Sequence, residues 1–382
     1  DDTLPAMARS SASKRASLGR IRWVFARTRW VLALALAGSL APSGCWDRMG
    51  PPAGREVEGE VALSLLALGD TGRRIEWAWL PSVQRRVGAA MAAADGERPV
   101  DALLLLGDNF YPKGIEEAML VRQVRMNLVR PYCRFVDLSG PHSDEVAGAC
   151  RKPPGERHPI PIFAVLGNHD YRVPESPKLQ AEAVPDFVVN WDLPSERIAV
   201  RELGRGVSLV LIHSMEMVRN AGRLHGLSEA IRSARGPWRI LLCHHPVTPT
   251  RSLEAHGRFE GRYMAEARRR IAEAGVPVQV VLSGHHHSLQ IIEPSSPGPL
   301  FQVVAGGGGG SLDEVEVVEG QRFASSRHGY ARIDLVRREG SERLVVSLYT
   351  TRSAWLPAGR PSLAARWSVA LDGTLRNEEA SR

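Results

Sequence analysis

The side chains best suited to chemistry in this chain lie at the ends of five short apolar runs. Each run closes on Asp, Asn, Tyr or His, which bind metal ions through oxygen or imidazole nitrogen. In chain order they read LLALGDTG (Leu65 to Gly72), LLLLGDNFY (Leu103 to Tyr111), FAVLGNHD (Phe163 to Asp170), ILLCHHP (Ile240 to Pro246) and VVLSGHHH (Val280 to His287). These five endings predict a single metal site assembled from the ends of a sheet.

The five endings offer seven potential metal ligands, which are Asp70, Asp108, Tyr111, Asn168, His244, His285 and His287. This set is too large for one tetrahedral ion and suits two ions that share a bridging carboxylate. Two-metal sites hold their ions about 3.5–4 Å apart and clamp both oxygens of a displacement at phosphorus. We expect the glycines at 69, 107, 167 and 284 to let the backbone turn sharply where each strand delivers its ligand.

Each motif taken alone has a simpler interpretation. Asp70 by itself would more often cap a helix than bind a metal. A single His after an apolar run is usually a hydrogen-bonded core residue. Gly-Asn-His-Asp and Gly-His-x-His are more specific, and the five motifs in this order favour the metal site.

The order GDTG, GDNFY, GNHD, HHP, GHHH resembles that of the calcineurin-like metallophosphoesterases, over about residues 60 to 355. The resemblance implies an α/β fold in which two mixed β-sheets pack as a sandwich flanked by helices. Asp108-x-x-Tyr111 is similar to the small, tartrate-resistant purple acid phosphatases, as are GHHHSLQ and GYARIDL (Gly329 to Leu335). We expect the segment 131 to 158 to be an insertion.

The resemblance also implies a role for each matching residue. The ligands of a ferric ion would be Asp70, Tyr111 and His287. The ligands of a divalent ion (Fe, Zn or Mn) would be Asn168, His244 and His285. Asp108 would bridge the two ions. His245 is expected to support the site without binding metal, and His286 to point away from it by strand alternation.

The metals would supply the attacking hydroxide, since coordination lowers the pKa of water from about 15.7 towards neutrality. His169, beside Asn168, is the predicted general acid, and Asp170 is expected to orient it. His256, in EAHG, resembles another active-site histidine of the subgroup. It lies three residues further from His244 than in those relatives, and the alternative is an ordinary surface residue.

These residues predict a binuclear metal-dependent phosphatase that hydrolyses phosphate monoesters of small molecules. One alternative is a phosphodiesterase or nucleotide hydrolase on the same site, because the ligands do not distinguish these substrates. Another is a surface lipoprotein that binds metal without catalysis, against which the complete ligand set and His169 argue.

The elements that must position these residues are strands alternating with helices. Helical patterns cover Ala78 to Ala94, Gly114 to Arg130 and Phe259 to Gly275, where Gly275 is a stop signal. Val207 to Ser214 adds a strand that ends without an obvious ligand. Strands alternating with helices indicate an α/β arrangement.

After residue 288 the pattern changes to strands without long helices between them, which predicts a second sheet packed on the first. The five-glycine tract Gly306 to Gly310 lacks the Lys and following helix of a phosphate-binding loop. A close backbone approach beside the metal site is the favoured interpretation of this tract.

The formal charge of +7 is concentrated at the N-terminus, where the first 29 residues carry +5 and the remainder +2. We therefore expect no nucleic-acid partner. The basic stretch precedes an apolar segment, Trp30 to Gly44, which is typical of an export signal. Cys45 follows it as in a bacterial lipobox, although Pro42 stands where Leu is usual. The alternatives to lipid attachment are ordinary cleavage and an uncleaved anchor.

These features predict an exported monomer of the periplasm or cell surface, with membrane attachment through a lipidated Cys45 as one possibility. Cys133 and Cys150 are expected to pair in an oxidising compartment, and Cys243 to be a buried thiol. The predicted organisation is a presequence over 1–45, a linker over 46–58, a metallophosphoesterase domain over 59–355 and a C-terminal extension over 356–382.

Overall fold

Fifteen strands in the described part of the chain form two mixed sheets. The computed structural model describes residues 57–72, 82–295, 298–352 and 360–378. The first sheet has the order β15-β14-β13-β12-β1-β2-β3-β4 and the second β11-β9-β10-β8-β7-β6-β5. The predicted export segment and Cys45 lie outside the described residues. Among the residues described, no helix has the length and apolar character needed to cross a membrane.

The strands of the first sheet are β1 (Glu60–Leu68), β2 (Ala102–Leu105), β3 (Ile162–Ala164), β4 (Trp191–Asp192), β12 (Gly329–Arg338), β13 (Ser341–Thr350), β14 (Ser362–Ala370) and β15 (Leu375–Asn377). β1 to β4 run parallel to one another, and β12 joins β1 antiparallel. β14 pairs along most of β13. The residues predicted as a C-terminal extension therefore continue this sheet.

The strands of the second sheet are β5 (Ile198–Gly204), β6 (Val207–Ile212), β7 (Trp238–Leu242), β8 (Val280–Ser283), β9 (Leu289–Ile292), β10 (Gln302–Ala305) and β11 (Gln321–Ser325). β6, β7, β8 and β10 are parallel. The prediction that all strands after residue 288 make their own sheet is wrong. β9 to β11 join β8, whereas β12 to β15 return to the first sheet.

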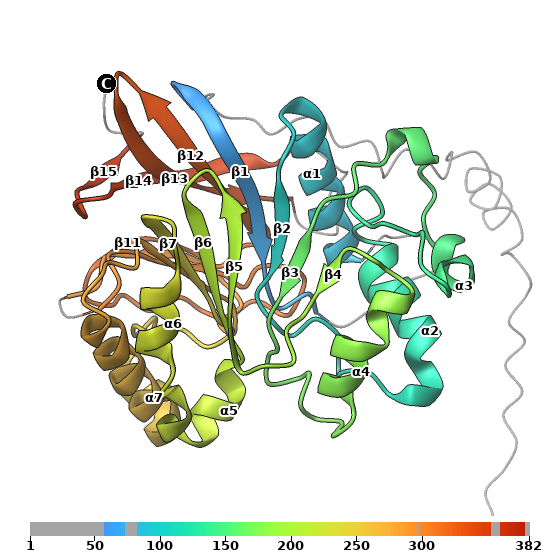
Figure 1. Cartoon of the computed structure of the whole chain (residues 1–382), viewed down its shortest axis with the longest axis horizontal. Helices are drawn as coiled ribbons and strands as arrows, with labels where there is room; N and C mark the ends of the chain where they lie inside the picture. Colours follow the sequence, from blue (N-terminus) through green and yellow to red (C-terminus); the bar gives the residue numbers. More distant parts are fainter. Residues whose placement is uncertain (1–56, 73–81, 296–297, 353–359, 379–382) are drawn as a thin grey trace, which may run out of the picture. The chain divides into compact units, whose positions relative to one another are not determined.

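Apolar side chains fill three layers. The alternate residues of both sheets, such as Leu65, Leu104, Ile240 and Leu282, form a shared core between the sheets. A second apolar cluster covers the other face of the first sheet, and a third joins the second sheet to α7. Figure 1 shows α1 to α4 beside the first sheet and α5 to α7 beside the second. The expected helix–sheet–sheet–helix sandwich is confirmed.

The longer helices are α1 (Val83–Glu97), α4 (Ser176–Glu182), α6 (Leu227–Ser233) and α7 (Leu253–Glu273), and the shorter are α2 (Leu120–Gln123), α3 (Ser143–Ala147) and α5 (Ser214–Arg219). The helix predicted over 114–130 is broken into a 3₁₀ turn, α2 and a π-helical segment, Val124–Val129. α7 ends as predicted, because Gly275 follows it at φ 67°.

The insertion is closed by a disulfide within it and is hydrogen-bonded to α1. Cys133 and Cys150 form the expected disulfide. Asp95 of α1, which is buried, accepts hydrogen bonds from His158 Nδ1 (2.9 Å), the Val100 amide and Arg134. Cys243 is a buried free thiol, as expected.

Candidate metal centre

The five polar endings meet where the two sheets face each other, and not at the edge of one sheet. β1, β2 and β3 of the first sheet lead to Asp70, Asp108 and Asn168, while β7 and β8 of the second lead to His244 and His285. The expectation of one sheet is thus corrected. The carboxyl ends of parallel strands from both halves of the sandwich converge on one point.

Asp108 lies at the centre of the cluster and is 1% exposed. Its Oδ2 accepts a hydrogen bond from Tyr111 at 3.0 Å, and its Oδ1 lies 3.6 Å from His244 Nε2. Each oxygen therefore faces a different group of predicted ligands, as a bridging carboxylate requires.

One group gathers around the side-chain oxygen of Asn168. Oδ1 lies 3.0 Å from His244 Nε2 and 3.1 Å from His285 Nδ1. His244 Nδ1 is 2.9 Å from the Leu106 carbonyl, which only accepts, so that nitrogen carries the proton and Nε2 a lone pair. Likewise His285 Nε2 lies 3.2 Å from a carboxylate oxygen of Glu260, which leaves the lone pair on Nδ1. Three lone pairs converge here with no proton between them.

The second group gathers around His287 Nε2, which lies 3.2 Å from the Tyr111 hydroxyl and 3.4 Å from Asp70 Oδ1. His287 Nδ1 donates to the Ser311 carbonyl, so Nε2 bears the lone pair when the ring is neutral. Asp70 Oδ1 is buried and accepts no hydrogen bond from a described residue. A buried carboxylate oxygen without a donor is costly unless a cation satisfies it.

Three of the predicted ligands carry backbone strain. Asp70, Asp108 and His285 have φ values of 56°, 54° and 68°, a region that non-glycine residues rarely adopt. The sequence interpretation assigned the sharp turns to the glycines before them, of which Gly107 alone has a positive φ. Gly167 instead allows the backbone to lie close to the Asp108 carboxylate, because a Cβ at position 167 would lie 2.2 Å from Asp108 Oδ1.

The five-glycine tract after β10 packs against the ligands, as expected. Gly310 donates its amide proton to the Asp70 carbonyl at 2.9 Å. A Cβ on Gly310 would lie 2.8 Å from the His287 ring, and one on Gly306 would lie 2.8 Å from Asp70 Oδ2. The tract lets the second sheet reach the first at the site.

Two of the predicted ligands, Tyr111 and His287, have raised pKa values. Burial, with the Asp70 and Asp108 carboxylates, raises the pKa of the Tyr111 phenol. Burial opposes the charged form of His287, but the Asp70 carboxylate outweighs it and raises the pKa to about 9. Metal ligation needs the deprotonated form of each group.

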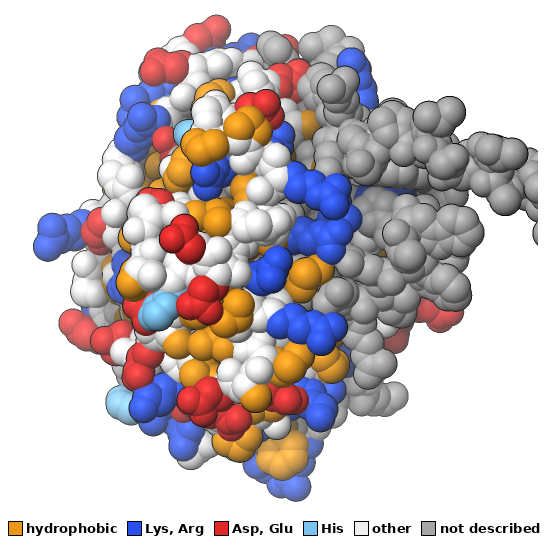
Figure 2. Space-filling model, turned by 90° about the vertical axis from the view of Figure 1, so that its right-hand side faces the viewer, with side chains coloured by type: hydrophobic (Ala, Val, Ile, Leu, Met, Phe, Trp, Pro, Cys, Tyr) orange, Lys and Arg blue, Asp and Glu red, His pale blue; other side chains and the backbone are white. Residues whose placement is uncertain are grey.

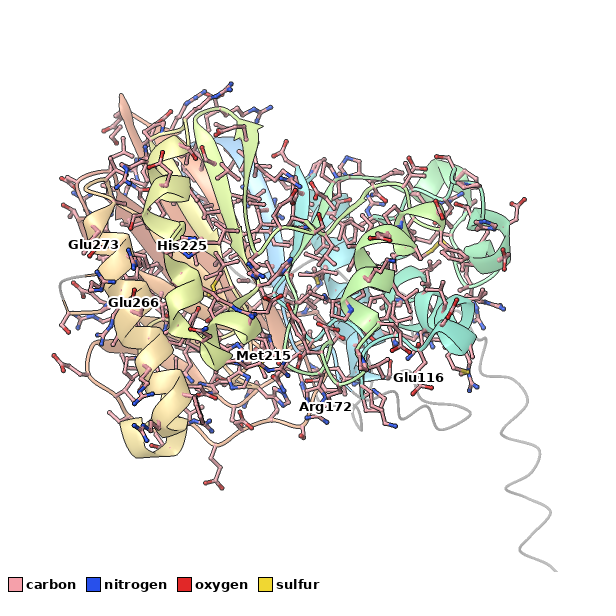
Figure 3. The ribbon with its side chains drawn as sticks, turned by 60° about the horizontal axis from the view of Figure 1, so that its bottom comes forward. Glu116, Arg172, Met215, His225, Glu266 and Glu273 are labelled. Atoms are coloured by element: carbon pink, nitrogen blue, oxygen red, sulfur yellow. A yellow bond between two sulfur atoms is a disulfide. The ribbon has the colours of Figure 1, made fainter. Side chains whose placement is uncertain are left out.

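His169 lies at the rim of this cluster, with its side chain 18% exposed. Its amide donates to Asp108 Oδ1 at 2.7 Å, and its Nδ1 donates to the Pro112 carbonyl at 2.7 Å. Its Nε2 accepts a hydrogen bond from Arg172 at 2.9 Å. Burial is the largest of the effects that lower the pKa of His169. Figure 3 labels Arg172 near the lower edge of the view, between Met215 and Glu116.

The predicted orientation of His169 by Asp170 is wrong. The fully buried Asp170 carboxylate instead accepts from the amides of Asn109, Phe110 and Gly167 and from Gln180. Burial and the nearby Asp108 raise the pKa of Asp170 to about 6, against these hydrogen bonds. Asp170 therefore ties the loop after β2 to the loop after β3, while the Pro112 carbonyl holds the His169 ring.

His245 supports the site through Ser214, which the sequence did not indicate. Ser214 Oγ accepts from the amides of His244 (3.2 Å) and His245 (2.9 Å) and lies 2.9 Å from His245 Nδ1. Burial and the neighbouring His285 lower the pKa of His245 well below its usual value. His286 is not directed away, since its ring lies 5.2 Å from that of His285 and bonds Thr250.

Three residues near the site carried no signal in the sequence. Arg172, Ser214 and Glu260 belong to no ligand motif, and the contacts of Ser214 and Glu260 join segments far apart in the chain. His256 belongs to the first turn of α7, beside the non-helical Gly257 (φ 72°). Its side chain lies outside the described residues, so its role stays a prediction.

The donors present fit cations. Imidazole nitrogens, carboxylates, an amide oxygen and a phenol suit Zn, Fe and Mn, and the buried Asp70 Oδ1 accepts no hydrogen bond from a described residue. Groups of His, Asp and Glu with ligand atoms within 4.8 Å of one another include Asp70, Asp108 and His244. The class that fold and site define is a metal-dependent hydrolase built on an αββα sandwich.

The chain belongs to the calcineurin-like phosphoesterase family, whose model matches residues 63–289. Members of this family use two metal ions, and membership makes the protein a metal-dependent hydrolase of phosphoesters. None of the curated protein sequences compared with the chain matches it.

Solved structures share the fold at low sequence identity. A purple acid phosphatase from yellow lupin seeds is 14% identical with a TM-score of 0.54, and the alignment covers 82% of this chain and 54% of that one. PhoD is 12% identical with a TM-score of 0.53, over 87% and 73%. GAP50, the anchor in the inner membrane complex of Plasmodium, is 14% identical with a TM-score of 0.54, over 78% and 86%.

Proposed function

We propose that this protein is a binuclear metallophosphatase that hydrolyses phosphate monoesters of small molecules. The observation that carries the proposal is the convergence of potential ligand atoms into two groups on either side of Asp108. Asn168, His244 and His285 would hold one ion, and Asp70, Tyr111 and His287 the other. Two bound cations supply water activation and offset charge on the phosphate oxygens.

The chain's own residues would hold the substrate and manage the leaving group. His169 holds its Nδ1 proton against Pro112, so a proton for the leaving oxygen must sit on Nε2, where Arg172 now donates. Burial lowers the pKa of His169 and so disfavours the protonated ring, which means that this proton is retained only at acid pH. The Asp170 carboxylate keeps the loops after β2 and β3 together by accepting hydrogen bonds from the amides of Asn109, Phe110 and Gly167.

Arg172 supports the preference for monoesters over diesters. It is exposed beside His169 and forms no ion pair with a carboxylate in the described part of the chain. A phosphate monoester carries one more negative charge on its terminal phosphate than a diester does. A guanidinium can bind two oxygens of a terminal phosphate through two parallel hydrogen bonds.

Tyr111 supports iron in the site it shares with Asp70 and His287. A phenolate favours a ferric ion, with Fe, Zn or Mn as the divalent partner. Loss of a visible absorption band on Tyr111→Phe would support this assignment. Colourless protein that contains Zn or Mn alone under oxidising conditions would contradict it.

The proposed location is outside the cytoplasm, in the periplasm or at the cell surface, either free or anchored through a lipidated Cys45. The Cys133–Cys150 disulfide supports export, because disulfides persist in oxidising compartments. The face in Figure 2 mixes hydrophobic, acidic and basic side chains, with a short column of Lys and Arg. That the protein is a monomer without a nucleic-acid partner stays a proposal.

The test compares turnover of p-nitrophenyl phosphate and bis(p-nitrophenyl) phosphate by metal-loaded protein across acid to alkaline pH. We expect faster turnover of the monoester, with Arg172→Ala raising KM for the monoester more than for the diester. Faster turnover of the diester would favour a phosphodiesterase. No turnover of either ester with both metals bound would exclude catalysis and leave a metal-binding protein.

A further inference from the structure

Glu260 occupies an unexpected place on α7. It shares a helix face with Tyr263, Met264 and Ala267, which are buried in the cluster that joins α7 to the second sheet. Position 260 is thus on the side where an apolar residue is usual. Its side chain is 20% exposed, and a carboxylate in such a place needs a specific partner.

One partner of Glu260 is the predicted metal ligand His285. Glu260 Oε1 lies 3.2 Å from His285 Nε2, while the other ring nitrogen, Nδ1, faces Asn168 Oδ1 at 3.1 Å. A carboxylate only accepts hydrogen bonds, so Nε2 must carry the ring proton. The ring then offers Nδ1, and no other nitrogen, to a cation beside Asn168.

We propose that Glu260 is a positioning residue that fixes the tautomer and orientation of His285 and so sets the affinity of the divalent-metal position. The inference rests on the metal centre proposed above. A carboxylate behind a metal-bound imidazole also increases the basicity of the ligand, and loss of such a partner typically costs about 10–100-fold in metal affinity.

α7 is fastened to the site at a second point, which makes Glu260 a rigid support. The Tyr263 hydroxyl donates to the His245 carbonyl at 3.2 Å, one residue after the ligand His244. The helix therefore contacts the loops after both β7 and β8. A direct ligand role for Glu260 is disfavoured, because its oxygen meets the ring nitrogen on the side away from Asn168.

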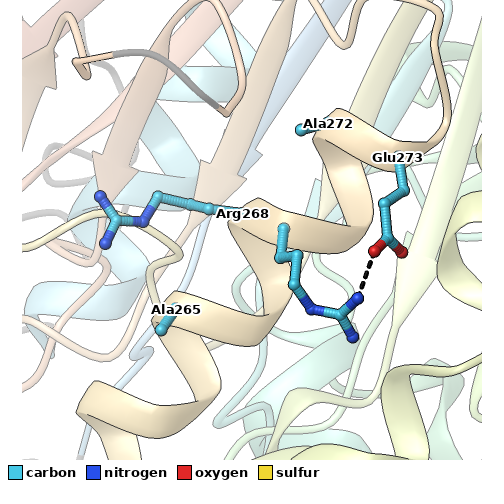
Figure 4. Close-up of a pocket in the computed structure, with 5 residues that line it drawn as sticks. Ala265, Arg268, Ala272 and Glu273 are labelled. Carbon is cyan, nitrogen blue, oxygen red and sulfur yellow. Dashed lines mark hydrogen bonds and ion pairs between the residues drawn. The ribbon is translucent and has the colours of Figure 1, made fainter.

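The same helix supplies a matched control. The side chain of Glu266 is also 20% exposed, but it pairs with Arg269 and with Arg270 (2.8 Å) on α7 itself. The neighbouring turn borders a surface hollow lined by Ala265, Arg268, Arg269, Ala272 and Glu273, where Arg269 and Glu273 form an ion pair (Figure 4). None of these five residues belongs to the metal centre.

The experiment titrates the metal-depleted full chain with Zn²⁺ against a chromophoric chelator, for the wild type, Glu260→Ala, Glu260→Gln and Glu266→Gln. We expect two bound ions in the wild type, with one of them weakened about 10–100-fold in Glu260→Ala. The Zn²⁺ affinity of Glu260→Gln should lie between those of the wild type and Glu260→Ala, because the amide oxygen still accepts a hydrogen bond from His285 Nε2 but carries no charge. Glu266→Gln should match the wild type.

Wild-type Zn²⁺ affinity in both Glu260 variants would overturn the proposal. An equal loss of Zn²⁺ affinity in Glu266→Gln would also overturn it, as would a wild type that binds no Zn²⁺. Metal content is measured without any ester. If the wild type binds two ions and hydrolyses nothing, the proposed function fails while the role of Glu260 is still decided by the titration.

Discussion

At the scale of single residues, the site depends on which atoms carry protons. The Leu106 and Ser311 carbonyls hold the Nδ1 protons of His244 and His287, so each neutral ring directs its Nε2 lone pair towards the predicted cations. The ligand types could be predicted from sequence because each stands directly after a strand. The partners that set their tautomers could not, because they are carbonyls or side chains brought close by the fold.

Asn168→Ala and His169→Ala should have different effects although the residues are adjacent. Asn168→Ala removes the oxygen between His244 and His285, so we expect loss of the divalent ion. His169→Ala keeps the hydrogen bond that the backbone N–H of residue 169 donates to Asp108 Oδ1 and should keep both metals. It should slow hydrolysis of alkyl phosphates by about 10²–10⁴-fold, and p-nitrophenyl phosphate much less.

Metal content and rates for the two ester types measure this difference. Equal rate losses for good and poor leaving groups in His169→Ala would show that His169 does not supply the proton. Loss of metal in that variant would instead make His169 part of the metal-binding framework.

At the scale of elements, the site requires strands from both sheets to end at one point. Parallel pairing within each sheet could be predicted from the alternation of strands and helices. The division of the five strands that precede the predicted ligands between two sheets could not be predicted, because the apolar runs of the two sheets have similar sequences. The break in the helix after Gly114 was also not indicated, since its sequence contains no proline between Gly114 and Arg130.

Gly167→Ala tests the close approach of the loops after β2 and β3. The added methyl would lie 2.2 Å from Asp108 Oδ1, so the bridging carboxylate must move. A displacement of about 1 Å at a reacting centre costs about 100-fold in rate, and we expect weaker metal binding as well. Gly96→Ala is the matched control, because a Cβ there meets nothing within 4 Å and lies in α1.

Metal affinity and phosphatase rate of both variants provide the measurement. Gly96→Ala should keep both and gain about 0.5–1 kcal/mol of stability through helix propensity. A Gly167→Ala protein with wild-type metal affinity would show that Asp108 is not held in place by this contact.

His213 links the two sheets and should make the metal-free protein less stable in acid. It accepts from the Leu166 amide at 3.2 Å through Nδ1, and its Nε2 lies 2.7 Å from the Pro194 carbonyl. Burial lowers the pKa of His213 from 6.5, so the unfolded chain binds the proton more readily. Its stabilising contribution is present above pH 6.5 and is lost as the pH falls through the folded-state pKa.

Thermal unfolding of metal-free protein between about pH 7 and pH 5 measures this effect. His213→Gln keeps an acceptor and a donor but does not titrate, so its melting temperature should fall less on acidification than that of the wild type. Parallel pH profiles for the two proteins would show that His213 does not contribute to acid sensitivity.

At the scale of the whole molecule, the packing of the two sheets brings the two halves of the predicted ligand set together. The shared core between the sheets fixes the distance between β1 to β3 and β7 to β8, and the glycine tract after β10 completes the contact. Family and sandwich fold could be predicted because the motifs occur in a specific order. The continuation of the first sheet by β12 to β15 could not, because strand order in a sheet depends on long-range pairing.

Anomalous X-ray diffraction from crystals of the metal-loaded protein tests the central claim most directly. The account predicts two anomalous peaks about 3.5–4 Å apart on either side of Asp108. One should lie beside Asn168, His244 and His285, the other beside Asp70, Tyr111 and His287. A single peak, or peaks whose ligands are His245, Glu260 or His286 in place of these residues, would contradict it.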